Sequence, residues 1–148
     1  MKNEDRLLAE KVLRQLFIGA KVDGLQLGTN RIFFKRLDHA DGQLYLNIES
    51  KWCLFPSPPE AYPKSEDEIE SYSEREALRK IDDIRGQEAV NIELGADSPH
   101  LIITFTNGTT LFINGRDHEY ECSQAGVHPN DDWLIVALPG DDIAVWTP

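Results

Sequence analysis

The sequence predicts a single α+β domain over residues 1–148, built from two helix-plus-β-meander units. Three observations lead to this prediction. The length suits one domain rather than two. A helical pattern followed by strand patterns occurs twice along the chain. Similar residues also recur at an offset of 67, so that Gly19 corresponds to Gly86 and Leu27 to Leu94.

The first unit, residues 3–55, opens with a helix. Asn3 is a candidate N-cap, and Leu8, Val12 and Leu16 recur at the spacing of one helix face. Gly19 is placed to end this helix. Strand patterns follow at 24–27, 31–36 and 44–55, the last with apolar and polar residues in alternation.

The second unit, residues 65–123, follows a crossover at 56–64 that carries four prolines. Two capping boxes, Ser65 with Glu68 and Ser73 with Glu76, open a helix that Gly86 ends. Strands are predicted at 89–94, 100–106, 109–114 and 120–123, and an Asn-Gly dipeptide at 107–108 predicts a tight hairpin. A C-terminal hairpin at 133–147 completes the chain, with its turn at 139–142.

We interpret the two units as an internal duplication. At the offset of 67, Phe34 corresponds to Leu101 and residues 44–47 to 111–114, and a slip of one residue aligns Trp52 with Tyr120. The alternative is chance, because any two amphipathic β segments share alternation. The units are expected to form a curved antiparallel sheet or a partly open barrel, with both helices packed on one face.

Composition and charge restrict the class of protein. Apolar residues make up 41% and charged residues 28%, which are ordinary globular values. The first residues lack the apolar core of a secretory signal, and no apolar run is long enough to cross a membrane. With two cysteines, a disulfide framework is not expected. The sequence therefore predicts a cytoplasmic protein.

The net charge of −11 is divided unevenly. Residues 1–59 contain nine Lys/Arg and seven Asp/Glu, whereas residues 60–148 contain six and nineteen. Such a surface repels phosphate backbones, which disfavours nucleic-acid binding. It would steer a basic partner toward the chain.

Residues that carry chemistry do not form a recognisable site in the sequence. Cys53 and Cys122 lie in strand-like runs, where a thiol is usually buried and inert. His118 and Cys122 would share a strand face, but two ligands do not make a tetrahedral zinc site. His39 and His128 are predicted in loops. We therefore expect no catalytic residues, no metal and no cofactor.

The acidic segments are the best candidates for a partner-binding surface. Residues 66–76 contain six acids against Arg75 alone, and residues 117–148 contain seven acids and no Lys or Arg. An aromatic residue beside acids is typical of a patch that binds a basic protein surface. The alternative is a solvated helix face and solvated turns. The predicted partner-binding residues are Glu66, Asp67, Glu70, Asp131, Asp132 and Trp133.

Several motifs resemble those of small bacterial immunity-type proteins found beside polymorphic or contact-dependent toxins. They are Trp52 at the end of a strand pattern, the run HLIITFTNGTTLFI at 100–113, EYEC at 119–122 and PGDDIAVW at 139–146. The resemblance lies mostly in residues 86–148. It implies a cytoplasmic inhibitor that binds a basic toxin domain stoichiometrically, and it transfers no catalytic residue.

Two other functions stay open at this point. One is a small-ligand-binding protein or an enzyme, with a site inside the curved sheet lined by Trp52, Tyr45, Phe112 and His100. The other is a homodimer formed through an open sheet edge.

Overall fold

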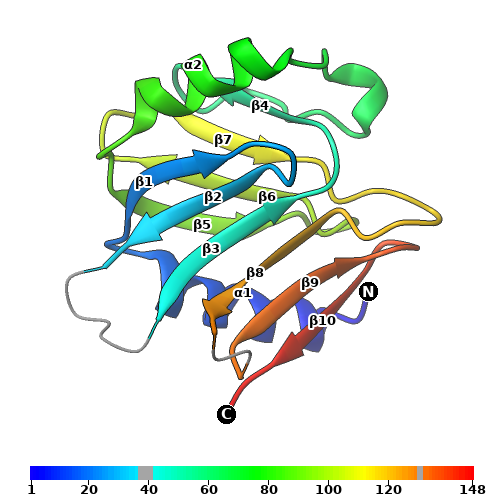
Figure 1. Ribbon diagram of the computed structural model, residues 1–148. Coiled ribbons are helices and arrows are strands. Elements are labelled where there is room, and N and C mark those ends of the chain that lie inside the picture. Colours follow the sequence, from blue (N-terminus) through cyan, green and yellow to red (C-terminus); the bar gives the residue numbers. More distant parts are fainter. Residues whose placement is uncertain (37–41, 130–131) are drawn as a thin grey trace.

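The computed structural model of the chain describes residues 1–36, 42–129 and 132–148 (Figure 1). Within these residues the fold is α+β, with two α-helices, one short 3₁₀-helix and ten antiparallel strands in two sheets that do not close into a barrel. The helical elements are α1 (Asn3–Phe17), η1 (Glu66–Glu68) and α2 (Glu74–Ile84). The strands are β1 (Lys21–Gln26), β2 (Arg31–Lys35), β3 (Gln43–Ile48), β4 (Trp52–Phe55), β5 (Ala89–Leu94), β6 (Leu101–Phe105), β7 (Thr110–Ile113), β8 (Ser123–His128), β9 (Leu134–Leu138) and β10 (Asp142–Trp146).

Each half of the chain contributes its fourth strand to the sheet of the other half. One sheet has the order β1-β2-β3-β8-β9-β10, and the other has the order β4-β7-β6-β5. Strand β4 therefore leaves the β1–β3 meander and pairs with β7, while β8 leaves the β5–β7 meander and pairs with β3. The predicted strand at 44–55 is thus two strands in different sheets.

Matching hydrogen bonds join the two halves where β1 and β5 begin. The N–H of Gly19 donates to the carbonyl of Ala89 at 2.9 Å, and the N–H of Gly86 donates to the carbonyl of Val22 at 2.8 Å. Both glycines have a positive φ, 88° and 85°, which a residue without a side chain adopts readily. Between them Lys21 and Glu88 form an isolated antiparallel bridge. The offset of 67 maps the donor and the acceptor residue of one hydrogen bond onto those of the other, and it also separates Lys21 from Glu88.

The same correspondence holds for a bulge in each half. The register of β1 against β2 shifts between Val22 and Gly24, and that of β5 against β6 shifts between Ala89 and Asn91. Beyond the bulges the constant offset predicted from the sequence is wrong. Phe34 pairs with Val22 in the first half. The residue that pairs with the equivalent Ala89 in the second half is Phe105, and not Leu101 as the offset predicts. The reason is that corresponding hairpin loops differ in length between the halves.

Of the connections in the two halves, the one before the fourth strand differs most in length. The N–H of Glu49 donates to the carbonyl of Cys122, and the N–H of Asn114 donates to that of Lys51, at 2.9 and 3.0 Å. One residue separates Glu49 from Lys51, whereas seven, at 115–121, separate Asn114 from Cys122. We call residues 115–121 the long loop. It is the reason why the last strand of the second unit begins at Ser123 rather than at Tyr120 as predicted.

The helices lie at opposite ends of the sheets and not on one face as expected (Figure 1). Helix α1 packs against β5 and β10, and α2 packs against β1. The exchange of fourth strands explains this, because each helix covers the first strand of the other half. The core between the sheets is continuous, and the ring of Phe17 from α1 meets that of Phe34 edge-on at 5.0 Å.

Of the predicted helix N-caps, that of α2 is confirmed and the other two are wrong. Ser73 and Glu76 form the predicted capping box of α2, with hydrogen bonds of 3.2 and 3.3 Å. The predicted capping box of Ser65 and Glu68 is wrong, because Ser65 precedes only the short η1 and makes no side-chain cap hydrogen bond, and the helix begins at the second box instead. Asn3 is the first residue of α1 and not its cap. Among the described residues, none of the helices has both the length and the apolar character needed to cross a membrane.

Candidate functional site

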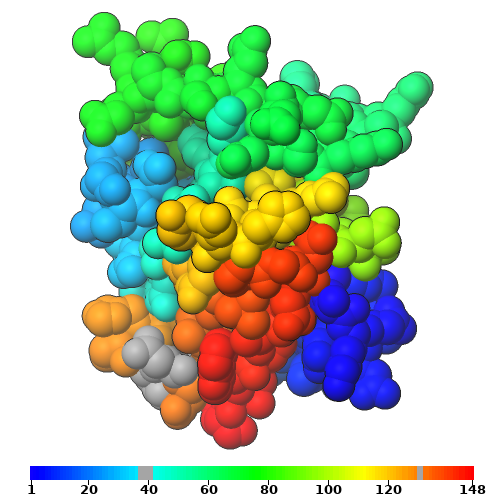
Figure 2. Space-filling view, turned by 90° about the vertical axis from the view of Figure 1, so that its right-hand side faces the viewer, coloured from blue at the N-terminus to red at the C-terminus, as the bar shows by residue number. Residues whose placement is uncertain are grey.

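The long loop and the crossover before α2 form the two walls of a groove. Its first part, with a volume of about 550 Å³, is lined by Ser65, Glu66 and Asp67 on one side and by residues 116–120 on the other. A second hollow of about 760 Å³ continues past Tyr120 and Glu119 to Glu49 and Glu121. Figure 2 shows the long loop in yellow, between the green crossover above and the orange-red C-terminal strands below. We call the two hollows together the acidic groove.

The long loop is fixed by hydrogen bonds along its whole length. The carboxylate of Asp117 accepts the backbone N–H groups of Glu119 and Tyr120 at 2.8 and 2.9 Å. These two hydrogen bonds lower the pKa of the Asp117 carboxyl, since they favour its charged form. The carbonyl of Asp117 accepts the N–H of Gly140 in the β9–β10 turn at 2.8 Å. The loop therefore presents Tyr120 from a preformed turn.

Tyr120 is the most exposed of the large apolar and aromatic side chains described, with 67% of its surface accessible. Carboxylates surround it. The side-chain amide of Gln124 donates to Glu49 at 2.7 Å and to Glu121 at 2.8 Å, so that these two acids are held beside each other. The acidic groove contains six carboxylates and one guanidinium, and these residues are Glu49, Glu66, Asp67, Asp117, Glu119, Glu121 and Arg116.

The crossover wall is anchored on the outer face of the smaller sheet. Ile69 is buried against Ile102 and Phe112, and the ring of Tyr62 stacks on Phe112 with centroids 5.7 Å apart. These apolar contacts fix η1, which carries Glu66 and Asp67. The position of both acids is therefore set by packing rather than by ion pairs.

His100 connects the two walls. Its Nδ1 accepts the N–H of Gly115 at the base of the long loop, at 2.9 Å. Its ring also interacts with the backbone of Lys64 in the crossover and lies 5.1 Å from the ring of Phe112. Burial lowers the pKa of His100, although nearby Asp141 opposes this effect. The neutral imidazole is thus the form that holds the groove together.

The predicted partner-binding residues separate into three places. Glu66 and Asp67 lie in the acidic groove, and Glu70 lies just beyond it, between two smaller clefts. Asp131 lies outside the described residues. Asp132 and Trp133 follow the far end of β8, about 20 Å from the long loop at the usual rise of a strand. Trp133 is half-buried and packs against the core.

Sequence reasoning missed Tyr120 as a site residue. The signal was present, because Tyr120 stands between Glu119 and Glu121 in the acidic back half. The sequence predicts a strand here, and in a strand the tyrosine and the acids would face opposite ways. The prediction therefore does not place them on one surface. The turn that Asp117 closes places them on one surface instead.

The candidates for catalysis do not converge. Burial raises the pKa of both the Cys53 and the Cys122 thiol to about 11, so both thiols are protonated at neutral pH. Among the described residues, no three His, Cys, Asp or Glu side chains are grouped to hold a metal ion. His39 lies outside the described residues, and His118 stands exposed in the acidic groove.

The residues proposed to line a site inside the sheet lie in different places. Trp52 packs into the main core with Tyr72 edge-on at 4.9 Å, whereas Phe112 belongs to the cluster on the outer face of its sheet. Tyr45 lies under the guanidinium of Arg31, at 4.5 Å. The ring of His100 lies against that of Phe112, on the outer face of the smaller sheet. These four side chains do not enclose one cavity.

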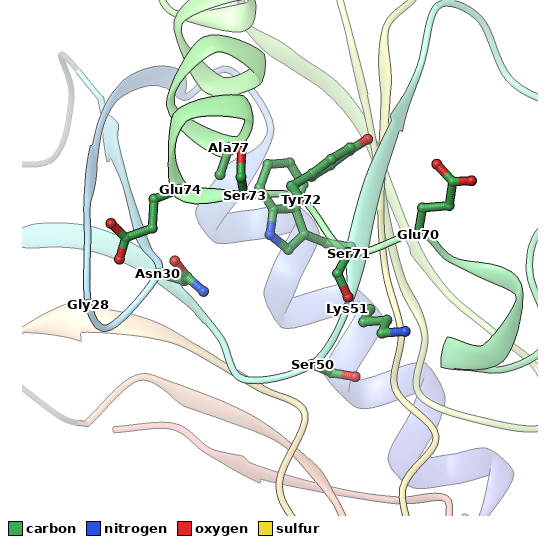
Figure 3. A pocket seen from close by; sticks show the side chains of 11 residues that line it. Gly28, Asn30, Ser50, Lys51, Glu70, Ser71, Tyr72, Ser73, Glu74 and Ala77 are labelled. Carbon is green, nitrogen blue, oxygen red and sulfur yellow. The ribbon is translucent and has the colours of Figure 1, made fainter.

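A smaller cleft of about 270 Å³ opens where α2 begins (Figure 3). Asn30 from the β1–β2 turn, Ser50 from the β3–β4 connection and Ser71 from the crossover surround it. The ammonium group of Lys51 donates to the carbonyl of Ile69 at 3.3 Å. The lining contains serine hydroxyls, the ammonium group of Lys51 and the carboxylates of Glu70 and Glu74, and no cysteine or histidine.

Comparisons with protein-family models, with curated proteins and with solved structures find no match for the chain.

Proposed function

We propose that the chain is a cytoplasmic protein-binding module whose acidic groove takes a basic surface of another protein. The sharpest form of the proposal is an immunity-type inhibitor that occupies a basic toxin domain stoichiometrically. The observation that carries it is an exposed tyrosine in a preformed turn, surrounded by carboxylates on both walls of a groove. Tyrosine is enriched in binding hot spots because it contributes a large contact area with little loss of side-chain freedom.

The comparison of the two halves supports the same surface. We propose that they arose by internal duplication, on the basis of the matching hydrogen bonds, glycines and bulges at the offset of 67. Relative to the first half, the second half carries six additional residues before its fourth strand. These residues include Tyr120 and three of the acids of the acidic groove. An addition that forms a surface and no core is expected for a function acquired by one copy.

Electrostatics favours a basic protein over other partners. Six carboxylates in one groove raise the local concentration of a cationic surface and speed its association. They repel nucleic acids and anionic lipids. The contribution to affinity comes from the groups that the partner desolvates, with Tyr120 at the centre and the acids at the rim.

The test uses the proteins encoded beside this chain, each produced separately and mixed with it. A partner should form a stoichiometric complex, and its association rate should fall steeply as salt increases from 50 to 500 mM, because the screening length of exposed charges falls from about 14 Å to about 4 Å over this range. Tyr120→Ala should speed dissociation by at least tenfold, on the order of 1.4 kcal/mol for one hot-spot residue. Glu66→Lys with Asp67→Lys should slow association.

Asp83→Lys is the control, because it makes the charge change of one of these two substitutions on an exposed turn of α2 outside the acidic groove. Asp132→Lys distinguishes the far end of β8 from the groove. A complex whose formation is independent of salt and unaffected by Tyr120→Ala would rule out the acidic groove as its binding surface.

A further inference from the structure

A second groove, of opposite character, lies between α2 and β1. It has a volume of about 620 Å³. Its floor is apolar and includes Leu25 and Ile81, and Leu78 borders it with 43% of its surface exposed. Arg75, Arg79 and Arg85 line it along the helix side, and we call it the arginine groove.

Between Asp23 and Gln26, the edge of β1 faces this groove without a hydrogen-bonding partner among the described residues. The backbone of Val22 hydrogen-bonds to the second half on the side of β1 away from β2, at the junction of the sheets. From Asp23 to Gln26 the strand hydrogen-bonds to β2 on one side only, among the residues that the structure describes. An antiparallel strand directs alternate N–H and C=O groups to each side, so this stretch offers free backbone groups to the groove.

The corresponding edge in the other half is closed. There Glu10 of α1 accepts the N–H of Leu94 at 2.9 Å, and Arg6 donates to the carbonyl of Leu94 at 3.4 Å. Natural proteins usually cover a free strand edge in such a way, since an open edge pairs with other chains. In the described part of the chain, the side-chain hydrogen bonds at α2 are those of its own capping box, between Ser73 and Glu76, and not to β1. The open edge is therefore specific to this half.

The charges of the groove select for an acidic occupant. Three guanidinium groups line it against the carboxylates of Asp23 and Asp82. None of these five groups forms an ion pair within 4.0 Å among the described residues. Arginine binds carboxylates through two parallel hydrogen bonds, which the groove leaves unused. The arginines belong to the second half of the chain, where residues 60–148 hold six basic and nineteen acidic residues, so they stand out from their surroundings.

We propose that the arginine groove binds an extended acidic segment of a partner protein, which lies antiparallel or parallel along β1 as an added strand. Its backbone pairs with the free edge between Asp23 and Gln26. Its acidic side chains face α2 and meet the three arginines, and its alternate apolar side chains point to the opposite face of the sheet. This surface is separate from the acidic groove, and it would allow the chain to hold two partners of opposite charge.

The test uses the whole protein and a capped synthetic peptide, Glu-Val-Glu-Val-Glu-Val, with Lys-Val-Lys-Val-Lys-Val as the charge-reversed control. In amide NMR spectra the acidic peptide should shift the resonances of residues 23–26 and of α2, and the basic peptide should not. Arg75→Glu combined with Arg79→Glu should weaken binding at least tenfold. Lys11→Glu, a charge reversal on an exposed position of α1, should leave it unchanged.

The contribution of the strand edge is tested separately. An acidic peptide with N-methyl groups on the residues that pair with β1 keeps its charges but cannot form the ladder, and it should bind at least tenfold more weakly. Equal binding of both peptide forms, or shifts confined to the arginines, would overturn strand addition. Shifts around Tyr120 without shifts in β1 would overturn the arginine groove as the site. Tyr120→Ala should not affect peptide binding, so failure here is distinct from failure of the proposed function.

Discussion

The backbone N–H of Gly115 donates to Nδ1 of His100 at 2.9 Å, and this hydrogen bond joins the base of the long loop to the start of β6. Only an imidazole with an unprotonated Nδ1 can accept it. The folded chain lowers the pKa of His100 from its usual 6.5, mainly by burial. The protonation state of one residue is thus linked to the geometry of the acidic groove.

The stability contribution of neutral His100 should be complete above pH 6.5 and should be lost as the pH falls through the lower pKa of the folded state. The unfolded chain binds the proton first, so acid favours unfolding. Urea denaturation followed between pH 7.5 and pH 5 should show the midpoint falling over this range.

His100→Asn is the matched variant, because the asparagine side-chain oxygen can take the place of Nδ1 as the acceptor and does not titrate. It should flatten the change in midpoint between pH 7.5 and pH 5. If the variant retains the full dependence of the wild-type chain, His100 is not its source. Residual change at the acid end would come from carboxylates.

Gly115 has no room for a side chain. A Cβ at this position would overlap the carbonyl carbon and oxygen of Pro99. Gly115→Ala should therefore lower the free energy of unfolding by about 1–3 kcal/mol, the usual range for overpacking at a buried site. Gly24→Ala is the control, since its Cβ would meet nothing within 4 Å and its φ is not positive. Thermal unfolding of both variants measures the difference, and equal melting temperatures would contradict the predicted overlap.

The two thiols should react slowly while the chain is folded. With a pKa of about 11, Cys53 and Cys122 carry a thiolate fraction at pH 8 that is roughly 200-fold smaller than that of a free cysteine with a pKa of 8.5. Reaction with a thiol-specific disulfide reagent should accelerate sharply on addition of 6 M guanidinium chloride. Rapid labelling of either cysteine in the native chain would show that its thiol is not shielded.

Glu10 protects the edge of β5. It accepts the N–H of Leu94 and lies 3.6 Å from Arg6 and 3.9 Å from Arg14 in ion pairs. Glu10→Ala should cost about 1–3 kcal/mol of stability, because the Leu94 N–H loses its partner. Gln15→Ala, on the exposed side of α1, should change stability by less than about 0.5 kcal/mol. Chemical denaturation of the two variants measures the difference in stability. If Glu10→Ala loses no more stability than Gln15→Ala, the edge of β5 does not depend on this contact.

The features that the sequence predicted well are local ones. Gly19 and Gly86 end segments at positive φ, Asn107-Gly108 forms the β6–β7 turn, and Ser73 caps α2. Each depends on residues within one turn of the chain, where conformational preference is decisive. The strand alternation also predicted the β segments other than β8 and that the fold is α+β.

The pairing of strands was not predictable in the same way. Trp52 and Ile113 are partners 61 positions apart, and nothing in either segment specifies the other. Strand β8 was displaced in the prediction because Ala125 and Gly126 give a weak β pattern, whereas the preceding Tyr120 gives a strong one. The site shows the same limit. The acidity of Glu66 and Asp67 was visible, but their meeting with the long loop depends on the packing of Ile69 and on His100.

The exchange of fourth strands also determines when the protein can finish folding as it is synthesised. Strand β3 ends at Ile48, but its neighbour β8 ends at His128, 80 residues later. At the usual pace of translation this interval lasts roughly 4–16 seconds. Throughout that time the nascent chain carries β3 with one unpaired edge, and β4 has no sheet until β7 emerges. If the ribosome pauses between residues 56 and 110, the nascent chain therefore exposes an incomplete sheet that is prone to pairing with the wrong strand.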